Sequence, residues 1–90
     1  MALEVSRNNT VGTMSTHQTM EQLRSDLAQN IKQVRKAQGV AQERLALDAE
    51  VDRTVVSKIE RCVGNPSLDT LLKLANRLNT TVSALLAPKV

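Results

Sequence analysis

The sequence predicts an all-α domain built from five short helices, and three observations lead to this fold class. From Met20 onward, apolar residues recur at intervals of three and four positions, which is the period of a helix. Most of these stretches follow a residue that favours a helix N-cap, and they end near glycine, asparagine or proline. No segment alternates apolar and polar residues in the way that a half-buried strand does. A chain of 90 residues has room for one domain.

The composition favours a polyanionic partner and excludes several kinds of site. Lys and Arg number 12 against 9 Asp and Glu, so the net charge is +3, which indicates a local basic patch rather than a general coat of charge. The absence of Phe, Tyr and Trp argues against modules that stack single-stranded bases on aromatic rings. Cys62 and His17 are the single residues of their types, whereas a structural zinc site takes about four such ligands. We therefore expect no metal and no cofactor.

The first part of the chain is predicted to be a tail. Residues 1–19 lack a helical period and are rich in Ser, Thr and Asn, which is typical of disorder. The alternative is a minor-groove arm, although Arg7 is the only cation in this segment. No secretory signal and no stretch of roughly 20 apolar residues is found, and one free cysteine fits a reducing compartment. These features predict a cytoplasmic protein, with residues 20–90 as its folded domain.

The first helix is expected over residues 20–38, and the second over 41–49. One face of the first carries an apolar stripe, and Gly39 supplies a C-terminal stop; the stripe consists of Leu23, Leu27, Ile31 and Val34. The second helix turns small and apolar residues inward, namely Leu45, Ala46 and Ala49.

Three further segments complete the domain. Asp52 is suited to cap a helix over 53–61, and residues 62–67 contain turn-forming Gly64, Asn65 and Pro66. Ser67 is suited to cap a fourth helix, whose apolar face consists of Leu68, Leu71, Leu72, Ala75 and Leu78. Thr81 is suited to cap a last helix, from Val82 to about Ala87.

The helix over 53–61 has two sharply different faces. At about 100° per residue, its apolar side chains fall within roughly a 100° arc, formed by Val55, Val56 and Ile59. The opposite arc is entirely polar and consists of Arg53, Thr54, Ser57, Lys58 and Arg61. Two short helices with a tight connection, the second presenting such a face, form a helix-turn-helix. Because the major groove of B-DNA is about 12 Å wide and admits one helix, this face predicts double-stranded DNA as the partner.

Three stretches resemble the lambda-repressor-like (Xre/Cro-type) helix-turn-helix regulators. They are "IKQVRKAQGVAQERLA" (31–46), "VDRTVVSKIER" (51–61) and "NPSLDTLLKLANRLNTTVSALL" (65–86), and the spacing between them fits without gaps. The resemblance covers roughly residues 22–86, and the run "DRTVVSKIER" is similar to the controller proteins of restriction–modification systems. It implies the five-helix lambda-repressor-like fold and a sequence-specific transcriptional regulator without catalytic activity.

The resemblance also implies roles for individual residues. The base-reading positions correspond to Arg53, Thr54, Ser57 and Lys58. The positions that contact backbone phosphate correspond to Gln42, Arg61 and Asn65, with Arg35 as a further candidate. Glu60 corresponds to a structural position, and a carboxylate beside phosphates would be repelled, so it is not expected in the site.

Two residues depart from the family pattern. Glu50 stands in the turn where glycine is common, and a non-glycine residue at positive φ is strained, so we expect a turn that is either wound differently or extended by helix. Ala41 replaces the usual Ser or Thr cap of the second helix, which costs about 1 kcal/mol. Both departures bear on the tilt of the helix over 53–61.

Some features keep two interpretations. Cys62, just past the third helix, is either a passive small residue or a redox switch, and His17 in the tail is expected to be inert. Three carboxylates around residue 50 do not follow the spacing of a calcium loop, and the sole histidine offers no nucleophile–base pair. An enzyme is therefore not expected.

The last helix raises the question of a dimer. This short terminal helix carries more apolar residues than its own packing requires, namely Val82, Leu85 and Leu86. We expect them to contact a second copy of the chain. The alternative is that they close the core of the monomer. A symmetric homodimer would read a palindrome with recognition helices about 34 Å apart. The rival function from another class is a protein-interaction module on the same fold, such as an antitoxin or a coactivator.

Overall fold

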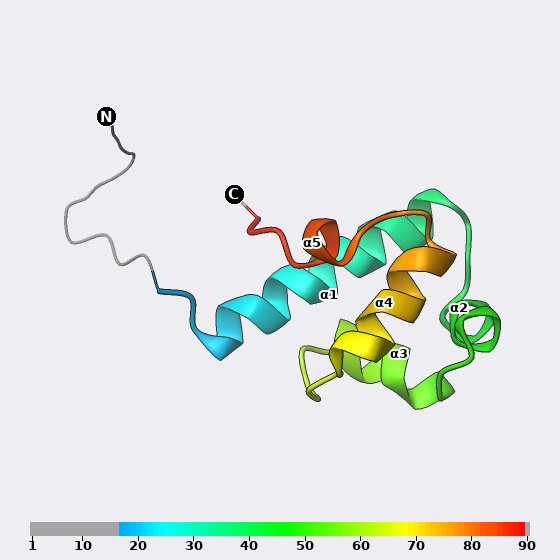
Figure 1. The fold of residues 1–90 in the computed structure, drawn as a ribbon, viewed down its shortest axis with the longest axis horizontal. Helices are drawn as coiled ribbons and strands as arrows, with labels where there is room; N and C mark the ends of the chain where they lie inside the picture. Colours follow the sequence, from blue (N-terminus) through cyan, green and yellow to red (C-terminus); the bar gives the residue numbers. More distant parts are fainter. Residues whose placement is uncertain (1–16, 90) are drawn as a thin grey trace.

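The computed structural model describes residues 17–89, and the predictions for residues 1–16 lie outside this range. The described part contains five helices and no strand (Figure 1). They are α1 (Met20–Ala37), α2 (Gln42–Ala49), α3 (Arg53–Glu60), α4 (Leu68–Arg77) and α5 (Val82–Leu85). The prediction of an all-α, five-helix domain is confirmed.

The helix ends follow local side-chain chemistry. Thr19 and Gln22 form a capping box at the start of α1, with both hydrogen bonds at 3.0 Å. Gly39, at φ 68°, lies just past its end, where a left-handed residue is needed. Asp52 Oδ1 accepts a hydrogen bond from the backbone N–H of Thr54 (2.9 Å) and so caps α3. The predicted stop at Gly39 and the predicted cap at Asp52 are therefore confirmed, whereas no cap is predicted from the sequence for the start of α1.

The two C-terminal helices are capped in the same way. Ser67 accepts from the backbone N–H of Thr70 (3.1 Å) at the start of α4, and Thr81 accepts from that of Ala84 (3.0 Å) at the start of α5. The last helix ends at Leu85 and is shorter than predicted.

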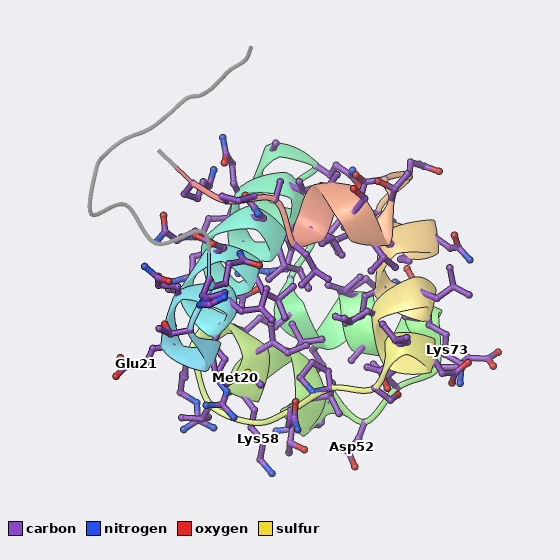
Figure 2. The ribbon with its side chains drawn as sticks, turned by 60° about the vertical axis from the view of Figure 1, so that its left-hand side comes forward. Met20, Glu21, Asp52, Lys58 and Lys73 are labelled. Atoms are coloured by element: carbon purple, nitrogen blue, oxygen red, sulfur yellow. The ribbon has the colours of Figure 1, made fainter. Side chains whose placement is uncertain are left out.

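One core holds all five helices together (Figure 2). Helix α3 packs against α1 and α2, α4 packs against α2, and α5 lies on α1 and α4. The fully buried large side chains come from every helix: Ile31, Leu45, Val56, Leu74, Leu78 and Leu85. Because the core contains no aromatic ring, its volume is filled by branched aliphatic side chains that interlock.

Leu85 corrects one expectation about the last helix. It was predicted to meet a second copy of the chain, but its side chain has no exposed surface and lies in the core. Its neighbours Val82 and Leu86 are partly buried and pack against the same core. With α5 lying across α1 and α4, Leu85 points into the interior and closes the monomer.

The turn between α2 and α3 also differs from expectation. Glu50 adopts the left-handed conformation itself, at φ 59° and ψ 43°. Its backbone N–H donates to Leu47 O (3.2 Å), and that of Val51 donates to Ala46 O (3.0 Å), which satisfies the last carbonyls of α2. The turn is thus wound as a glycine would wind it, and the strain at Glu50 is tolerated because flanking contacts fix both helices.

Candidate nucleic-acid interface

Helix α3 is anchored by one face and open on the other. Val56 and Ile59 are buried, and Val55 is half-buried against the core. Arg53, Thr54 and Lys58 are exposed, as the helical period predicts, whereas Ser57 is half-buried. Figure 2 shows Lys58 and Asp52 projecting from the same side of the molecule into solvent. The polar face is therefore free to meet a partner.

A hollow of about 330 Å³ lies between the first turns of α2 and α3. It is lined by Gln42, Glu43, Arg53, Thr54 and Ser57. The fold thus brings predicted phosphate-contacting Gln42 beside three of the predicted base-reading residues. Glu43 was not expected here, because the helical period of α2 marks it only as one of several exposed positions.

Arg53 and Glu43 form an ion pair across this hollow. Arg53 Nη1 lies 3.1 Å from Glu43 Oε2, and both side chains are about three-quarters exposed. Beside it, the hydroxyl of Thr54 donates to Asp52 Oδ1 (2.8 Å). The backbone N–H and the hydroxyl of Thr54 lower the pKa of Asp52, so a fixed negative charge stands at the start of α3.

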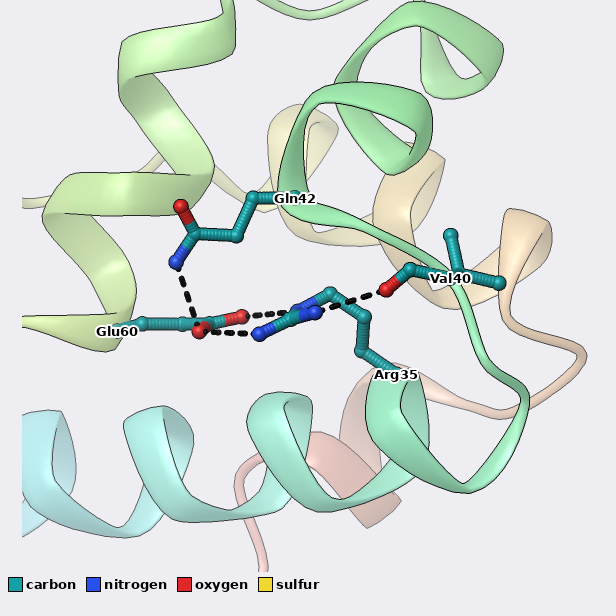
Figure 3. A network of polar contacts seen from close by, with 4 residues as sticks. All are labelled: Arg35, Val40, Gln42 and Glu60. Atoms are coloured by element: carbon teal, nitrogen blue, oxygen red, sulfur yellow. Dashed lines mark hydrogen bonds and ion pairs between the residues drawn. The ribbon is translucent and has the colours of Figure 1, made fainter.

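Beneath the exposed face, a buried polar network joins three helices (Figure 3). The guanidinium of Arg35, on α1, donates to both carboxylate oxygens of Glu60 on α3, at 2.7 and 2.9 Å. Its third donor reaches Val40 O at 2.8 Å, and Gln42 Nε2 on α2 donates to Glu60 Oε1 at 2.9 Å. The carboxylate of Glu60 therefore holds the start of α2 and the end of α3 in a fixed relation.

Arg35 corrects a second expectation. Its side chain is almost completely buried, and its donors are engaged by Glu60 and Val40. Its location near the end of α1 indicated a phosphate contact, but the crossing of α1 on α3 turns the guanidinium inward. Arg35 is a structural residue, and Glu60 is structural as the family pattern implies.

The pKa values of this pair follow from competing effects. Burial opposes the charged form and would by itself raise the pKa of Glu60, but hydrogen bonds from Arg35 and Gln42 and the charge of Arg35 together lower it. The hydrogen bond to Glu60 raises the pKa of Arg35 despite burial. Both groups are charged at neutral pH and form a buried ion pair.

Two further predicted phosphate contacts lie past α3. Arg61 is the C-cap residue of α3 and is exposed, and Asn65 is exposed in the following loop. The loop is tied to α1 because Arg24 Nε donates to Gly64 O at 2.9 Å. Arg24 was not expected to take this role, since no local pattern marks a contact between residues 40 positions apart.

Cys62 lies in the same region with an exposed side chain and φ of 63°. Over residues 17–89, no group of three or more His, Cys, Asp or Glu side chains could hold a metal ion. No helix in the described part of the chain has the length and apolar character to cross a membrane.

Together, α2, the turn over residues 50–52 and the polar face of α3 define a helix-turn-helix domain of the lambda-repressor-like class. The chain belongs to the helix-turn-helix family HTH_3, whose model matches residues 31–85. It is thereby a DNA-binding transcription regulator of the Xre type.

Individual relatives include controller proteins. Control protein C.SmaI of Serratia marcescens is 40% identical over 60 residues, which are 67% of this chain and 71% of that protein. The chain spans less than two thirds of the length of three other curated relatives, for example 64% of a Neisseria meningitidis hypothetical transcription factor.

Solved structures show the same fold. A hypothetical transcription factor from Neisseria, NHTF, matches with a TM-score of 0.72 at 35% identity, covering 83% of this chain and 86% of that one. The restriction-modification controller protein C.AhdI of Aeromonas hydrophila matches with a TM-score of 0.66 at 35% identity, covering 69% and 94%.

Proposed function

We propose that this chain binds a specific palindromic operator in double-stranded DNA as a homodimer and regulates transcription in the cytoplasm, with no cofactor and no catalytic step. The observation that carries the proposal is the exposed polar face of α3, which is supported from behind by a buried apolar face and by the Glu60 network. A helix held in this way can enter the major groove without losing contact with its own domain.

In this proposal α3 reads base edges. Arg53 can donate two hydrogen bonds to guanine O6 and N7, which discriminates by about 1–3 kcal/mol. The remaining base contacts come from Thr54 and Lys58, which are exposed, and from half-buried Ser57 on the same face.

Phosphate contacts flank this face. Gln42 uses one amide N–H for Glu60, so its second amide N–H remains available to donate to a phosphate oxygen. Ala41 provides no side-chain cap, which leaves the first backbone N–H groups of α2 open to the same anion. Arg61 and Asn65 would contact phosphate beyond the end of α3.

The homodimer is proposed from apolar surface on the C-terminal half. Leu68 and Leu72 lie one turn apart on α4 and are 74% and 50% exposed. Partly buried Val82 and Leu86 on and beside α5 would add to this surface, whereas Leu85 is withdrawn from it. Burial of such leucines between two copies would stabilise the pair by removing apolar area from water.

The function is tested by selecting bound duplexes from a random oligonucleotide pool and then titrating salt. We expect a two-fold symmetric consensus, and a binding constant that falls as log K against log salt with a slope of about −0.9 for each phosphate contacted. An asymmetric consensus would contradict the proposed homodimer. Absence of any enriched sequence would contradict the proposal of sequence-specific binding.

A protein-interaction module is the second candidate, because the exposed Leu47, Leu68 and Leu72 could equally meet a partner protein. An antitoxin or coactivator of this kind would keep its function when Arg53 is replaced by alanine. A sequence-specific DNA-binding regulator would lose function with the same substitution.

A further inference from the structure

We propose that Glu43 is a positioning residue that sets the base preference of Arg53, an inference that rests on the proposed function. Glu43 lies in the first turn of α2, outside the helix that reads bases, and contacts α3 through the Arg53 guanidinium. Base preference would therefore depend on a residue that need not touch a base.

The geometry allows Arg53 to hold Glu43 and guanine together. Only Nη1 of Arg53 is bonded to Glu43, and among the described residues no acceptor is bonded to its Nε or Nη2. Nε and Nη2 form one edge of the planar guanidinium, and two parallel N–H groups are what guanine O6 and N7 require. Glu43 thus fixes one corner of the group and leaves a complete edge for the base.

Stability does not account for this pair. Both side chains are about three-quarters exposed, and exposed pairs contribute about 0–1 kcal/mol. The acid next in sequence to Arg53 is Asp52, whose Oδ1 is already bonded by the backbone and hydroxyl of Thr54. Glu43 is therefore the acceptor that orients Arg53 in the described structure.

Bound DNA makes the pair more important. If Arg53 turned away to another base or a phosphate, the carboxylate of Glu43 would stand unpaired in a surface approached by phosphates, and like charges repel. This penalty falls on sequences that draw Arg53 away from Glu43, and it does not fall on a site whose guanine accepts the free edge. Glu43 would thus act against the wrong sequences as well as in favour of the right one.

The test compares affinities of Glu43→Gln and wild-type protein for the selected duplex and for a duplex with the Arg53-contacted guanine replaced. The glutamine keeps the size of the side chain but removes its charge. We expect binding to the replaced duplex to strengthen about two- to fivefold because one repulsive charge is lost. We expect discrimination between the two duplexes to fall about fivefold, a part of what a bidentate arginine supplies.

Two controls separate positioning from charge. Glu21→Gln removes the same charge from an exposed residue of α1 and should leave discrimination unchanged (Glu21 is labelled in Figure 2). In an Arg53→Ala background, Glu43→Gln should still strengthen binding to both duplexes, with no further change in discrimination. Unchanged urea midpoints would show that the variants remain folded.

An equal change for both duplexes in the Glu43→Gln single variant would overturn the positioning role and leave the proposed function standing. Failure of the wild-type protein to bind any duplex would overturn both.

Discussion

The guanidinium of Arg35 and the carboxylate of Glu60 form a buried ion pair with two hydrogen bonds, at 2.7 and 2.9 Å, which joins α1 to the last turn of α3. Because Gln42 bonds the same carboxylate, this pair links all three helices that position the polar face of α3. Its energetic role differs from that of the exposed pair between Arg53 and Glu43, and the difference can be measured.

Replacing Arg35 by alanine should destabilise the domain by about 3–5 kcal/mol, since it leaves the Glu60 carboxylate buried without its partner. Arg35→Lys should also be costly, because an ammonium group cannot reproduce the forked contact with Glu60 and the bond to Val40 O. Urea unfolding measures both values. Arg53→Ala, which breaks an exposed pair, should cost about 0–1 kcal/mol, and equal losses for Arg35 and Arg53 would contradict the assignment.

Acid should destabilise the domain through Glu60. Its pKa is lower in the folded state than in the unfolded chain, so its contribution is complete above the unfolded pKa of about 4.3 and is lost as pH falls through the folded pKa. The free energy of unfolding should therefore decline with acid over that range. Glu60→Gln should show a smaller decline, and an unchanged pH profile in this variant would exclude Glu60 as a source.

Arg53→Ala should weaken binding to the selected duplex by about 1–3 kcal/mol and relax base preference at one position in each half-site. The comparison is made at one salt concentration on selected and random duplexes. Lys89→Ala is a suitable control, since it removes a cation bonded to α1 near the C-terminal end. If Arg53→Ala lowers affinity equally on both duplexes, Arg53 contacts phosphate rather than a base.

Gln42→Ala should weaken binding to all sequences alike, because its proposed contact is with phosphate. It should also cost about 1 kcal/mol of stability, since Glu60 loses one of its donors. Parallel binding and urea titrations resolve the two effects. A selective loss on the preferred duplex would place Gln42 among the base-reading residues.

Glu50→Gly should stabilise the domain by about 0.5–1 kcal/mol. The left-handed conformation at φ 59° costs a residue with a side chain about 1–2 kcal/mol, and the greater freedom of unfolded glycine offsets part of the gain. Thermal unfolding of the two proteins provides the measurement. A lower midpoint for the glycine variant would mean that the Glu50 side chain makes a stabilising contribution of its own.

Local chemistry made much of this structure predictable. The periodic apolar residues identified every helix, and Asp52 and Ser67 marked the starts of α3 and α4 because a capping oxygen acts over only two or three residues. The polar face of α3 followed from the same period, since Val56 and Ile59 fix which side is buried.

Contacts between distant segments were not predictable in the same way. Arg35 and Glu60 are 25 residues apart and meet only because α1 crosses α3, so the sequence by itself indicates a phosphate contact for Arg35. The sequence pattern does not distinguish an apolar side chain that faces its own core from one that faces another copy, so it does not predict the burial of Leu85. The pairing of Glu43 with Arg53 depends in turn on the geometry of the connection at Glu50.

The length of α3 has a final consequence. Its eight residues are fewer than the roughly 12–15 that an isolated helix needs in water. Packing against α1 and α2 therefore stabilises its helical conformation. A synthetic peptide covering residues 51–61 would be a coil, and grafting this stretch onto an unrelated scaffold would not transfer recognition. Unfolding of the helical bundle would abolish the proposed DNA recognition in the same cooperative step.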